Sequence, residues 1–376
     1  MSTTTGIIFS NLHDMSIADL TRRRTMASVP FGCRYRLVDF ALSNMVNDGI
    51  SDISVITHNN YRSLMDHLGS GKDWDLARRS GGLKILPPFI TTNQGENNLY
   101  DTRLEALKNV QGFVADIKTD NVVLSDCDAI CNIDLRSVIE YHTAEGADAT
   151  CVVTRKTLTP DISEKYRLIY SNDSNDVTDV IAHPKKFSGE GDVLVNIWIF
   201  DRRYLQSALA DASAHGYKSF TTDVILKNLG KHTIKVYHYD GYYASIDSMA
   251  GYFAVNMELL DAKTREALFK VKERPIYTKV RNSAPSKYVG GANVKNSLIA
   301  DGCLIEGTVE NSILFRGVHV GKGAIVKNSI LFQDTQVLAG ASINCVIADK
   351  NVVIRDGVIL SGHPTMPFYI EKYKMI

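Results

Sequence analysis

Short apolar runs alternate with segments of helical periodicity through the first two thirds of the chain. In residues 36–47, for example, Leu37, Phe40, Ala41 and Met45 share one helical face. The predicted strands are 6–9, 53–57, 83–86 and 121–124, and the predicted helices are 36–47, 61–68, 102–114 and 135–144. Such alternation predicts an α/β domain, residues 1–260, with a mostly parallel sheet covered by helices.

The periodicity changes after residue 260. A polar helix and connector with Pro275 and Pro285 occupies residues 261–290. In residues 291–376, aliphatic residues recur every six positions, and Asn-Ser or Asn-Cys pairs followed by an aliphatic begin at Asn296, Asn311, Asn328 and Asn344. This pattern predicts a β-helix with three short strands per coil. The aliphatic residues expected to point inward are Ile299, Ile305, Leu314, Val320, Val326, Leu331, Val337, Ile343, Ile347, Val353 and Ile359.

Composition narrows the possible partners and compartment. The 376 residues carry 42 basic and 42 acidic side chains, and this balance argues against nucleic acid or an anionic membrane as a partner. No apolar run is long enough to span a bilayer, and residues 1–5 lack the features of a signal peptide. The six cysteines form no zinc-binding set, so we expect buried free thiols in a reducing cytoplasm.

The loop after the first predicted strand carries the most specific motif. Residues 29–44 read VPFGCRYRLVDFALSN and are followed by Asn47-Asp48-Gly49-Ile50. This stretch resembles the bacterial glucose-1-phosphate adenylyltransferases (ADP-glucose pyrophosphorylases), whose pattern is V-P-F-G-G-K-Y-R-I-I-D-F-x-L-S-N and then N-S-G-I. The resemblance implies a nucleotidyltransferase-like (Rossmann-like) mixed-sheet domain followed by a left-handed β-helix, and it therefore covers nearly the whole chain.

The front of the same loop departs from the family. The family motif G-G-x-G-[ST]-R-L brings backbone N–H groups and an Arg to the nucleotide phosphates. Residues 11–17 here read NLHDMSI, without the glycines or the Arg, and a family Lys is replaced by Met26. Leu12 cannot cheaply adopt the positive φ of a glycine, and Asp14 would repel a triphosphate.

The expected metal site is also incomplete. Nucleotidyl transfer needs a divalent cation that two carboxylates hold. By resemblance Asp128 is the retained first carboxylate, whereas Ser245 replaces the second. Asp247 lies two residues further on, which in a strand displaces its carboxylate by roughly 6–7 Å. For Asp126 and Asp247 the favoured interpretation is loop capping and solvation, and for Asp128 that interpretation and metal binding stay open.

Residues that would contact the sugar phosphate have changed as well. His183 replaces a Lys, Asn196 replaces a Gly, and the segment containing Thr102 has lost a Gly. A neutral His is a weaker phosphate ligand than Lys. The resemblance therefore implies a substrate-like pocket without intact catalytic residues, formed by Asn11, Leu12, Asp14, Thr102, Asp128, His183 and Asn196.

Arginines cluster around the loop. Arg22, Arg23, Arg24, Arg34 and Arg36 flank it, and Arg34 matches the family Lys that contributes to activator binding. They form either a solvated face or a site for a sugar-phosphate or phosphate effector.

The closest resemblance within the family is to its D-type subunit, whose catalytic motifs are degenerate. It implies a non-catalytic or weakly active regulatory subunit for the reaction of ATP and glucose 1-phosphate to ADP-glucose and pyrophosphate in glycogen biosynthesis. The partner would be a catalytic paralogue, in a hetero-tetramer, with Mg²⁺ only in that paralogue. The alternatives are an active nucleotidyltransferase with a rearranged metal site and a stand-alone sugar-phosphate or nucleotide sensor. An acyltransferase that uses His319 of the β-helix as a base ranks below these.

Overall fold

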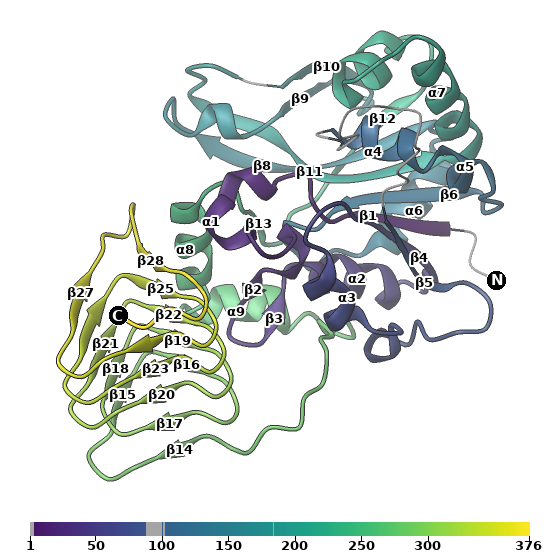
Figure 1. Ribbon diagram of the computed structural model, residues 1–376. Coiled ribbons are helices and arrows are strands. Elements are labelled where there is room, and N and C mark those ends of the chain that lie inside the picture. The colour runs from purple at the N-terminus through teal and green to yellow at the C-terminus, as the bar shows by residue number, and fades with distance from the viewer. Residues whose placement is uncertain (1–3, 88–99, 101, 183) are drawn as a thin grey trace.

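The protein has an α/β part and a stack of short strands that lies against it (Figure 1). The computed structural model describes residues 4–87, 100, 102–182 and 184–376. The chain leaves the α/β part after α9 (Ala262–Phe269) and reaches the stack through an extended segment. No helix in the described ranges combines the length and apolar character that a membrane span requires. All six cysteines are free, and five are buried.

The central sheet of the α/β part is mixed, and it contains nine strands within the described residues. Its principal order is β10-β9-β11-β6-β1-β4-β5, and β8 joins β11 to β12. The pairs of β1 with β4 and β6 are parallel, whereas β11 runs antiparallel to β6, β8 and β9. The alternation of predicted strands and helices overestimated the parallel content of the sheet. The strands β9, β10 and β11 follow one another without an intervening α-helix, and they pair antiparallel. The strands are β1 (Thr4–Phe9), β4 (Asp52–Ile56), β5 (Gly82–Leu86), β6 (Asn121–Asp126), β8 (Ala149–Leu158), β9 (Leu168–Ser171), β10 (Val177–Ile181), β11 (Gly189–Asp201) and β12 (Ile234–His238).

Helices cover both faces of this sheet and bury two apolar clusters. They are α1 (Ala18–Thr21), α2 (Val38–Asn47), α3 (Arg62–Leu68), α4 (Arg103–Asn109), α5 (Gln111–Ala115), α6 (Leu135–Ala144), α7 (Arg202–Ala214) and α8 (Met249–Glu258). The single helix predicted over 102–114 is wrong: it is two helices, because Val110 leaves the helical region (φ −111°, ψ 24°) beside the weak helix former Gly112. Two small ribbons, β2 (Pro30–Phe31) with β3 (Tyr35–Arg36) and β7 (Ala129–Cys131) with β13 (Tyr243–Ser245), lie beside the sheet.

The second part is a left-handed β-helix built from three five-stranded parallel sheets. One sheet holds β14 (Lys287–Tyr288), β17 (Leu304–Ile305), β20 (His319–Val320), β23 (Gln336–Val337) and β26 (Val353–Ile354). The next holds β15 (Asn293–Lys295), β18 (Thr308–Glu310), β21 (Ile325–Lys327), β24 (Ser342–Asn344) and β27 (Ile359–Ser361). The third holds β16 (Leu298–Ile299), β19 (Ile313–Leu314), β22 (Ile330–Leu331), β25 (Val346–Ala348) and β28 (Phe368–Ile370).

The inward positions of the β-helix follow the predicted hexads until the last full coil. Leu314, Leu331, Val337 and Ile343, for example, lie in the apolar interior as expected. In the last coil, however, Leu331 pairs with Ala348, seventeen residues later, so Ala348 and Ile354 point inward and Ile359 is 78% exposed. The prediction for Ile347, Val353 and Ile359 is wrong because it aligned Asn344 with Asn328. The corner residue equivalent to Asn328 (φ 44°) is Cys345 (φ 52°), which follows it by the same number of residues as Asn328 follows Asn311.

One sheet of the β-helix packs against the α/β part. Phe315, Ile330 and Phe332 belong to the same apolar cluster as the loop after β1 and helix α8. The Tyr252 ring of α8 meets Phe332 edge-on, with ring centroids 6.4 Å apart. The β-helix therefore completes one apolar face of the α/β part.

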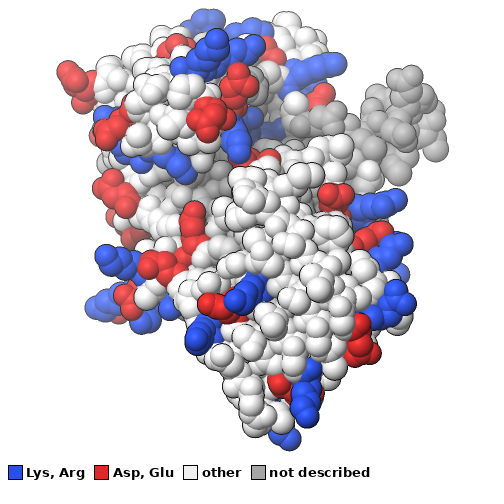
Figure 2. All heavy atoms as spheres, turned by 90° about the vertical axis from the view of Figure 1, so that its left-hand side faces the viewer, with Lys and Arg blue, Asp and Glu red and all other residues white. Residues whose placement is uncertain are grey.

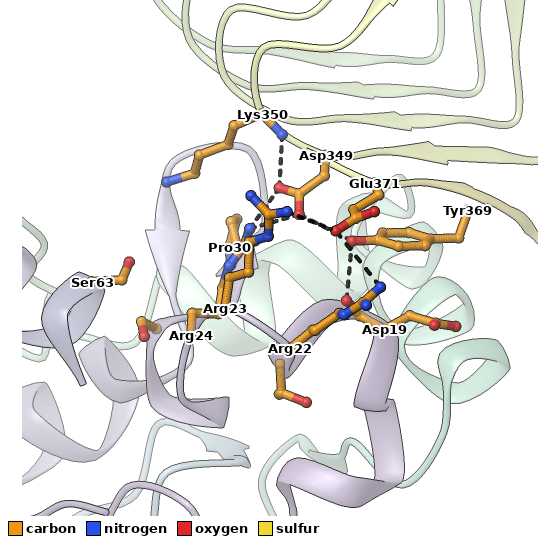
Figure 3. A network of polar contacts seen from close by, with 12 residues as sticks. Asp19, Arg22, Arg23, Arg24, Pro30, Ser63, Asp349, Lys350, Tyr369 and Glu371 are labelled. Atoms are coloured by element: carbon orange, nitrogen blue, oxygen red, sulfur yellow. Dashed lines mark hydrogen bonds and ion pairs between the residues drawn. The ribbon is translucent and has the colours of Figure 1, made fainter. Parts of the chain in front are cut away.

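A buried ion pair accompanies this apolar contact. The Arg24 guanidinium, after α1, donates to both carboxylate oxygens of Asp349 at 2.8 and 2.6 Å, and both side chains are almost fully buried. The Tyr369 hydroxyl oxygen lies 3.1 Å from both Asp349 Oδ2 and the Asp19 carbonyl oxygen, and its hydrogen can be donated to either. Figure 3 shows Asp349 facing the loop, with Tyr369 and Glu371 beside it. The ion pair thereby fixes the loop against the β-helix.

Replacement of Asp349 by Ala should lower the free energy of unfolding by about 3–5 kcal/mol, because Arg24 would keep a buried charge without a partner. Urea unfolding followed by circular dichroism measures this loss. Glu371→Ala is the matched control: its pairs with Arg22 and Arg23 are more exposed, and we expect a change of about 0–1 kcal/mol. Equal effects of the two substitutions would contradict the assignment.

Candidate functional site

The loop that follows β1 closes as a short 3-10 helix, Asp14–Ile17, where the family has its glycine loop. Asn11 organises its start: its side-chain oxygen accepts from Ser10 Oγ at 2.6 Å and from the His58 N–H at 3.0 Å. Leu12 is not among the residues with positive φ. The backbone therefore turns without the left-handed conformation that a glycine would allow.

Asp14 occupies a structural position in this loop. Its carboxylate accepts from Asn11 Nδ2 at 2.6 Å and from the Met26 N–H at 2.7 Å. Burial raises the pKa of Asp14 to about 6, against the lowering effect of these hydrogen bonds. A carboxylate thus takes a backbone N–H of the kind that phosphate-binding loops present to a phosphate.

Asp128, the retained first carboxylate, is buried and paired with His13. His13 Nδ1 lies 2.7 Å from Asp128 Oδ2. The charge of Asp128 raises the pKa of His13, against its desolvation. Burial alone would raise the pKa of Asp128, but the charge and hydrogen bond of His13 hold it below its ordinary value. The His13 imidazole therefore occupies the Asp128 oxygen that would otherwise be available to a metal cation.

Asp126 is paired in the same way with Arg103, the first residue of α4. Arg103 Nε donates to Asp126 Oδ1 at 2.8 Å, and Arg103 Nη2 bonds the other carboxylate oxygen. Asp126 is 1% exposed, so the interpretation that it is a solvated cap is wrong. Sequence reasoning missed Arg103, because its partner Asp126 lies 23 residues away, at the end of strand β6.

Ser245 lies where the second carboxylate was expected. The β7–β13 pairing places Ser245 opposite Ala129, the residue after Asp128. Asp247, two residues on, is engaged in other contacts: it pairs with Lys165 at 2.9 Å and accepts from Ser248 Oγ at 2.9 Å. Ser245 therefore offers only a hydroxyl, and the carboxylate of Asp247 is already bound to other residues.

A catalytic Mg²⁺ does not fit this arrangement. Possible ligand atoms of His13, Asp126 and Asp128 lie within 4.8 Å of one another. Their carboxylates, however, are occupied by the imidazole and the Arg103 guanidinium, and Mg²⁺ requires oxygen ligands in near-ideal octahedral geometry. To bind Mg²⁺, the protein would have to break two buried ion pairs, and Ser245 would still not supply a second carboxylate.

The remaining predicted pocket residues have identifiable local roles. Thr102 caps α4 by accepting from the Glu105 N–H at 3.2 Å, and it donates to the Lys218 carbonyl at 2.8 Å. Asn196 has φ 63°, which explains a Gly at this position in the family, since Asn tolerates the left-handed region. His183 lies outside the described residues.

The five arginines around the loop do not form one site. Arg22 and Arg23 pair with Glu371 at 3.8 and 3.1 Å, and Arg24 pairs with Asp349. Arg36 donates to the Ser63 carbonyl and hydroxyl at 2.7 and 3.0 Å. Arg34 is exposed, and its guanidinium lies 5.7 Å from the centroid of the Tyr35 ring.

Two further basic residues near these arginines escaped the sequence analysis, because they belong to the β-helix. Burial, followed by the charges of Arg36 and Arg24, lowers the pKa of Lys350 to about 6. Arg316 is 8% exposed, and burial and then the charge of Arg34 lower its pKa. Lys350 therefore extends the Arg24 and Arg36 group, whereas Arg316 extends the Arg34 group.

The comparisons with known proteins agree with the two parts of the fold described above. A family model described as nucleotidyl transferase matches residues 16–261, and one described as GlmU-like, C-terminal hexapeptide, matches residues 284–365. The first match spans more than half of the chain, so the chain belongs to the nucleotidyl transferase family.

The relatives narrow the comparison within this family. The chain is 36% identical over 372 residues to "Glycogen biosynthesis protein GlgD" of Bacillus subtilis (strain 168), a match that covers 98% of this chain and 95% of that one. It is 37% identical to the protein of the same name from Geobacillus stearothermophilus, over 85% of this chain and 82% of the other. It is 31% identical to "Glucose-1-phosphate adenylyltransferase" of Geobacillus stearothermophilus, over 83% and 80%. The resemblance inferred from residues 29–44 is confirmed.

Asp14→Asn should stabilise the protein above pH 6 but not near pH 4. The folded-state pKa of about 6 exceeds the ordinary value, so the stability that protonated Asp14 contributes is lost as pH rises through 6. An uncharged Asn avoids this loss, and we expect a gain of about 1–3 kcal/mol at pH 8. Thermal or urea unfolding at pH 4 and pH 8 measures it. Asp19→Asn, at an exposed position of α1, should change stability at neither pH, and an equal gain for Asp14→Asn at both would refute the burial argument.

Proposed function

We propose that this chain is a non-catalytic or weakly active regulatory subunit in glycogen biosynthesis, acting in the cytoplasm on a catalytic glucose-1-phosphate adenylyltransferase. The observation that carries the proposal is the pairing of Asp128 with His13 and of Asp126 with Arg103. With Ser245 opposite Ala129, these pairs leave the cleft without a carboxylate pair for the metal that nucleotidyl transfer requires. Similarity to GlgD along 98% of the chain supports the pathway.

An active nucleotidyltransferase with a rearranged metal site is the second candidate. It would need Asp247 to leave Lys165 and to move toward Asp128, while Asp128 exchanged His13 for the metal. Each exchange breaks an ion pair of the folded protein, so we favour the regulatory subunit. The third candidate, a sensor that acts alone, differs from the first in having no catalytic partner.

The purified chain should form no ADP-glucose at an ordinary enzymatic rate of about 1–1000 s⁻¹ with ATP, glucose 1-phosphate and Mg²⁺. Ser245→Asp should not rescue it, because catalytic groups that act as a unit are non-additive. Added to a tagged catalytic paralogue from the same organism, the chain should co-elute with it and should change its kcat or KM.

Three outcomes separate the candidates. Metal-dependent turnover by the pure chain would establish the active enzyme instead. Neither turnover nor co-elution would leave the stand-alone sensor. Co-elution without a change in kcat, KM or effector response would remove the regulatory role.

We further propose that residues 291–376 are the assembly unit of a hetero-tetramer, distinct from residues 1–260 and a connector at 261–290. Exposed apolar side chains gather near the end of the β-helix, where Ile359 is 78% and Met366 is 80% exposed. The β-helix fills the lower part of Figure 2, where a broad area bears no charged side chain. Permanent interfaces are more apolar than the rest of a protein surface and often bury more than about 2,000 Å².

We place the effector, a phosphate or sugar phosphate, at Arg34 and Arg316. Arg34 is exposed, and Arg316 Nε is buried without a hydrogen-bond partner among the described residues. The other predicted arginines are engaged by Glu371, Asp349 and Ser63. An anion between the two guanidiniums would relieve their mutual repulsion, and Arg binds phosphate in a bidentate manner.

Arg34→Ala should weaken the effector response of the mixed enzyme by about tenfold or more, as the loss of a charge-assisted hydrogen bond would. The activation curve of the mixed enzyme measures this change. Arg22→Ala is the matched control, because Arg22 is also exposed but makes a 3.8 Å pair with Glu371; it should leave the curve in place. An unchanged curve for Arg34→Ala would exclude Arg34 from the effector site.

A further inference from the structure

A cavity of about 910 Å³ opens at the edge of the central sheet where strand β6 begins, at Asn121. The end of α6, the segment before β8 and the start of α7 line it. Because α6 packs into one apolar cluster and α7 into the other, the cavity lies between the two faces of the sheet. Asp126, at the opposite end of β6, lies roughly 17 Å away along the strand. The cavity is therefore separate from the cleft described above.

Arg202, the first residue of α7, brings a positive charge to this cavity. Its N–H donates to the Asp120 carbonyl at 2.9 Å, so the backbones of these two lining residues lie side by side. Their side chains nevertheless form no ion pair, with each other or with any other residue that the structure describes. Arg202 Nε is buried, and the described part of the chain offers it no hydrogen-bond partner. Such an N–H carries a desolvation cost, which an anionic oxygen of a ligand would offset.

His142 of α6 presents a second polar atom to the same cavity. This lining residue is only 2% exposed. Its Nδ1 lies 2.8 Å from Thr150 Oγ1, whereas Nε2 has no hydrogen-bond partner within the described ranges. Burial lowers the pKa of His142 to about 4, although the charges of Asp201 and Asp148 oppose this shift. The imidazole is therefore neutral at physiological pH, and Nε2 can form a hydrogen bond with an uncharged polar group.

Carboxylates outnumber guanidinium groups around the cavity, and this excess limits the charge of a ligand. The charged residues of the lining are Asp120, Glu140, Asp148, Asp201, Arg202 and Arg203. A phosphate dianion would meet a net negative lining and would be repelled. A molecule with one carboxylate and one ammonium group has no net charge, and each of its charges can pair with a group of opposite sign. The lining therefore favours a zwitterion over a phosphate ester.

Two of these carboxylates remain available to an ammonium group. Asp148 accepts from the Thr233 N–H at 2.9 Å, and Asp201 accepts from two N–H groups of α7, so both already have partners. Asp120 and Glu140 are exposed, and their carboxylates have no partner among the residues that the structure describes. Because residue 120 lies beside residue 202, opposite unpaired charges are within reach of one small molecule.

We propose that this cavity binds a free α-amino acid with an uncharged polar side chain. Arg202 holds the carboxylate, since guanidinium and carboxylate groups form paired hydrogen bonds. Asp120 holds the ammonium group, and His142 Nε2 bonds the polar end of the side chain. The inference does not depend on the proposed regulatory role, because neither the cleft nor the β-helix contributes a residue to this lining.

The size of the cavity leaves one further source of the same chemistry. A volume of about 910 Å³ falls within the range of about 300–1,000 Å³ that small-molecule sites span. It would also admit a short peptide, whose two termini carry the same two charges. A dipeptide probe separates this source from a free amino acid.

Calorimetry on the full chain measures binding, with L-glutamine, L-asparagine and L-serine as probes. At least one of them should bind saturably. Its N-acetyl derivative lacks the ammonium group and its α-amide lacks the carboxylate, so each should bind about tenfold or more weakly. Inorganic phosphate should not displace the amino acid, and the glycyl dipeptide of the same amino acid should bind more weakly than the amino acid.

Two charge-removing substitutions should identify the site. Arg202→Gln and Asp120→Asn should each weaken binding about tenfold or more. Arg202→Gln should also abolish the discrimination against the α-amide, and Asp120→Asn that against the N-acetyl derivative, because each pair of changes removes the same contact. Arg136→Gln and Asp116→Asn, exposed and outside the lining, are the matched controls and should bind as the unmodified chain does. Unchanged thermal unfolding verifies that each variant is folded.

Four results would overturn the proposal. They are the absence of saturable binding for all three amino acids, unchanged affinity in both Arg202→Gln and Asp120→Asn, displacement of the amino acid by phosphate, and tighter binding of the dipeptide. The last would assign the cavity to a peptide instead. None of these results would alter co-elution with a catalytic paralogue, so failure of this site and failure of the regulatory role are distinguishable.

Discussion

The ion pair between Arg24 and Asp349 joins two parts of the chain that are 325 residues apart. A charge is expensive to remove from water, so two charges remain buried together only where each satisfies the other. The pair therefore requires the loop after β1 and the penultimate coil of the β-helix to meet in one register. The apolar contact of Tyr252 with Phe332 lies in the same interface and depends on that register. The position of the loop, and with it the form of the cleft, follows from this docking.

The same requirement for paired charges governs the cleft. In a metal-dependent nucleotidyltransferase, the carboxylates would be balanced by a divalent cation. Here they are balanced by His13, Arg103 and, at Asp247, Lys165. Each internal cation stabilises the folded protein without a ligand and removes a position at which the metal could bind. The contacts that stabilise the cleft without a ligand are therefore the same contacts that occupy its carboxylates.

Basic side chains without an ion-pair partner mark the places where the protein can bind an anionic ligand. Arg34 and Arg316 form such a group within the described residues. Under the function proposed above, these two cations would provide an anion site that needs no metal ion.

The sequence by itself determined the features that depend on local order. Apolar runs and helical spacing predicted the strands β1, β4, β5 and β6 and the helices between residues 36 and 144, because strands and helices impose their own periods on buried positions. The strands β8 to β12 were not predicted. Hexads predicted the β-helix, and the changed residues at the glycine loop and at Ser245 already indicated a cleft without a complete metal site. Tertiary structure decided which charges meet. The partners of Asp126, Asp128 and Asp349 come from other segments, and no local pattern encodes an ion pair across 115 or 325 residues. It also decided the register of the last coil, since the corner lies at Cys345 and not at Asn344, where the sequence motif had placed it.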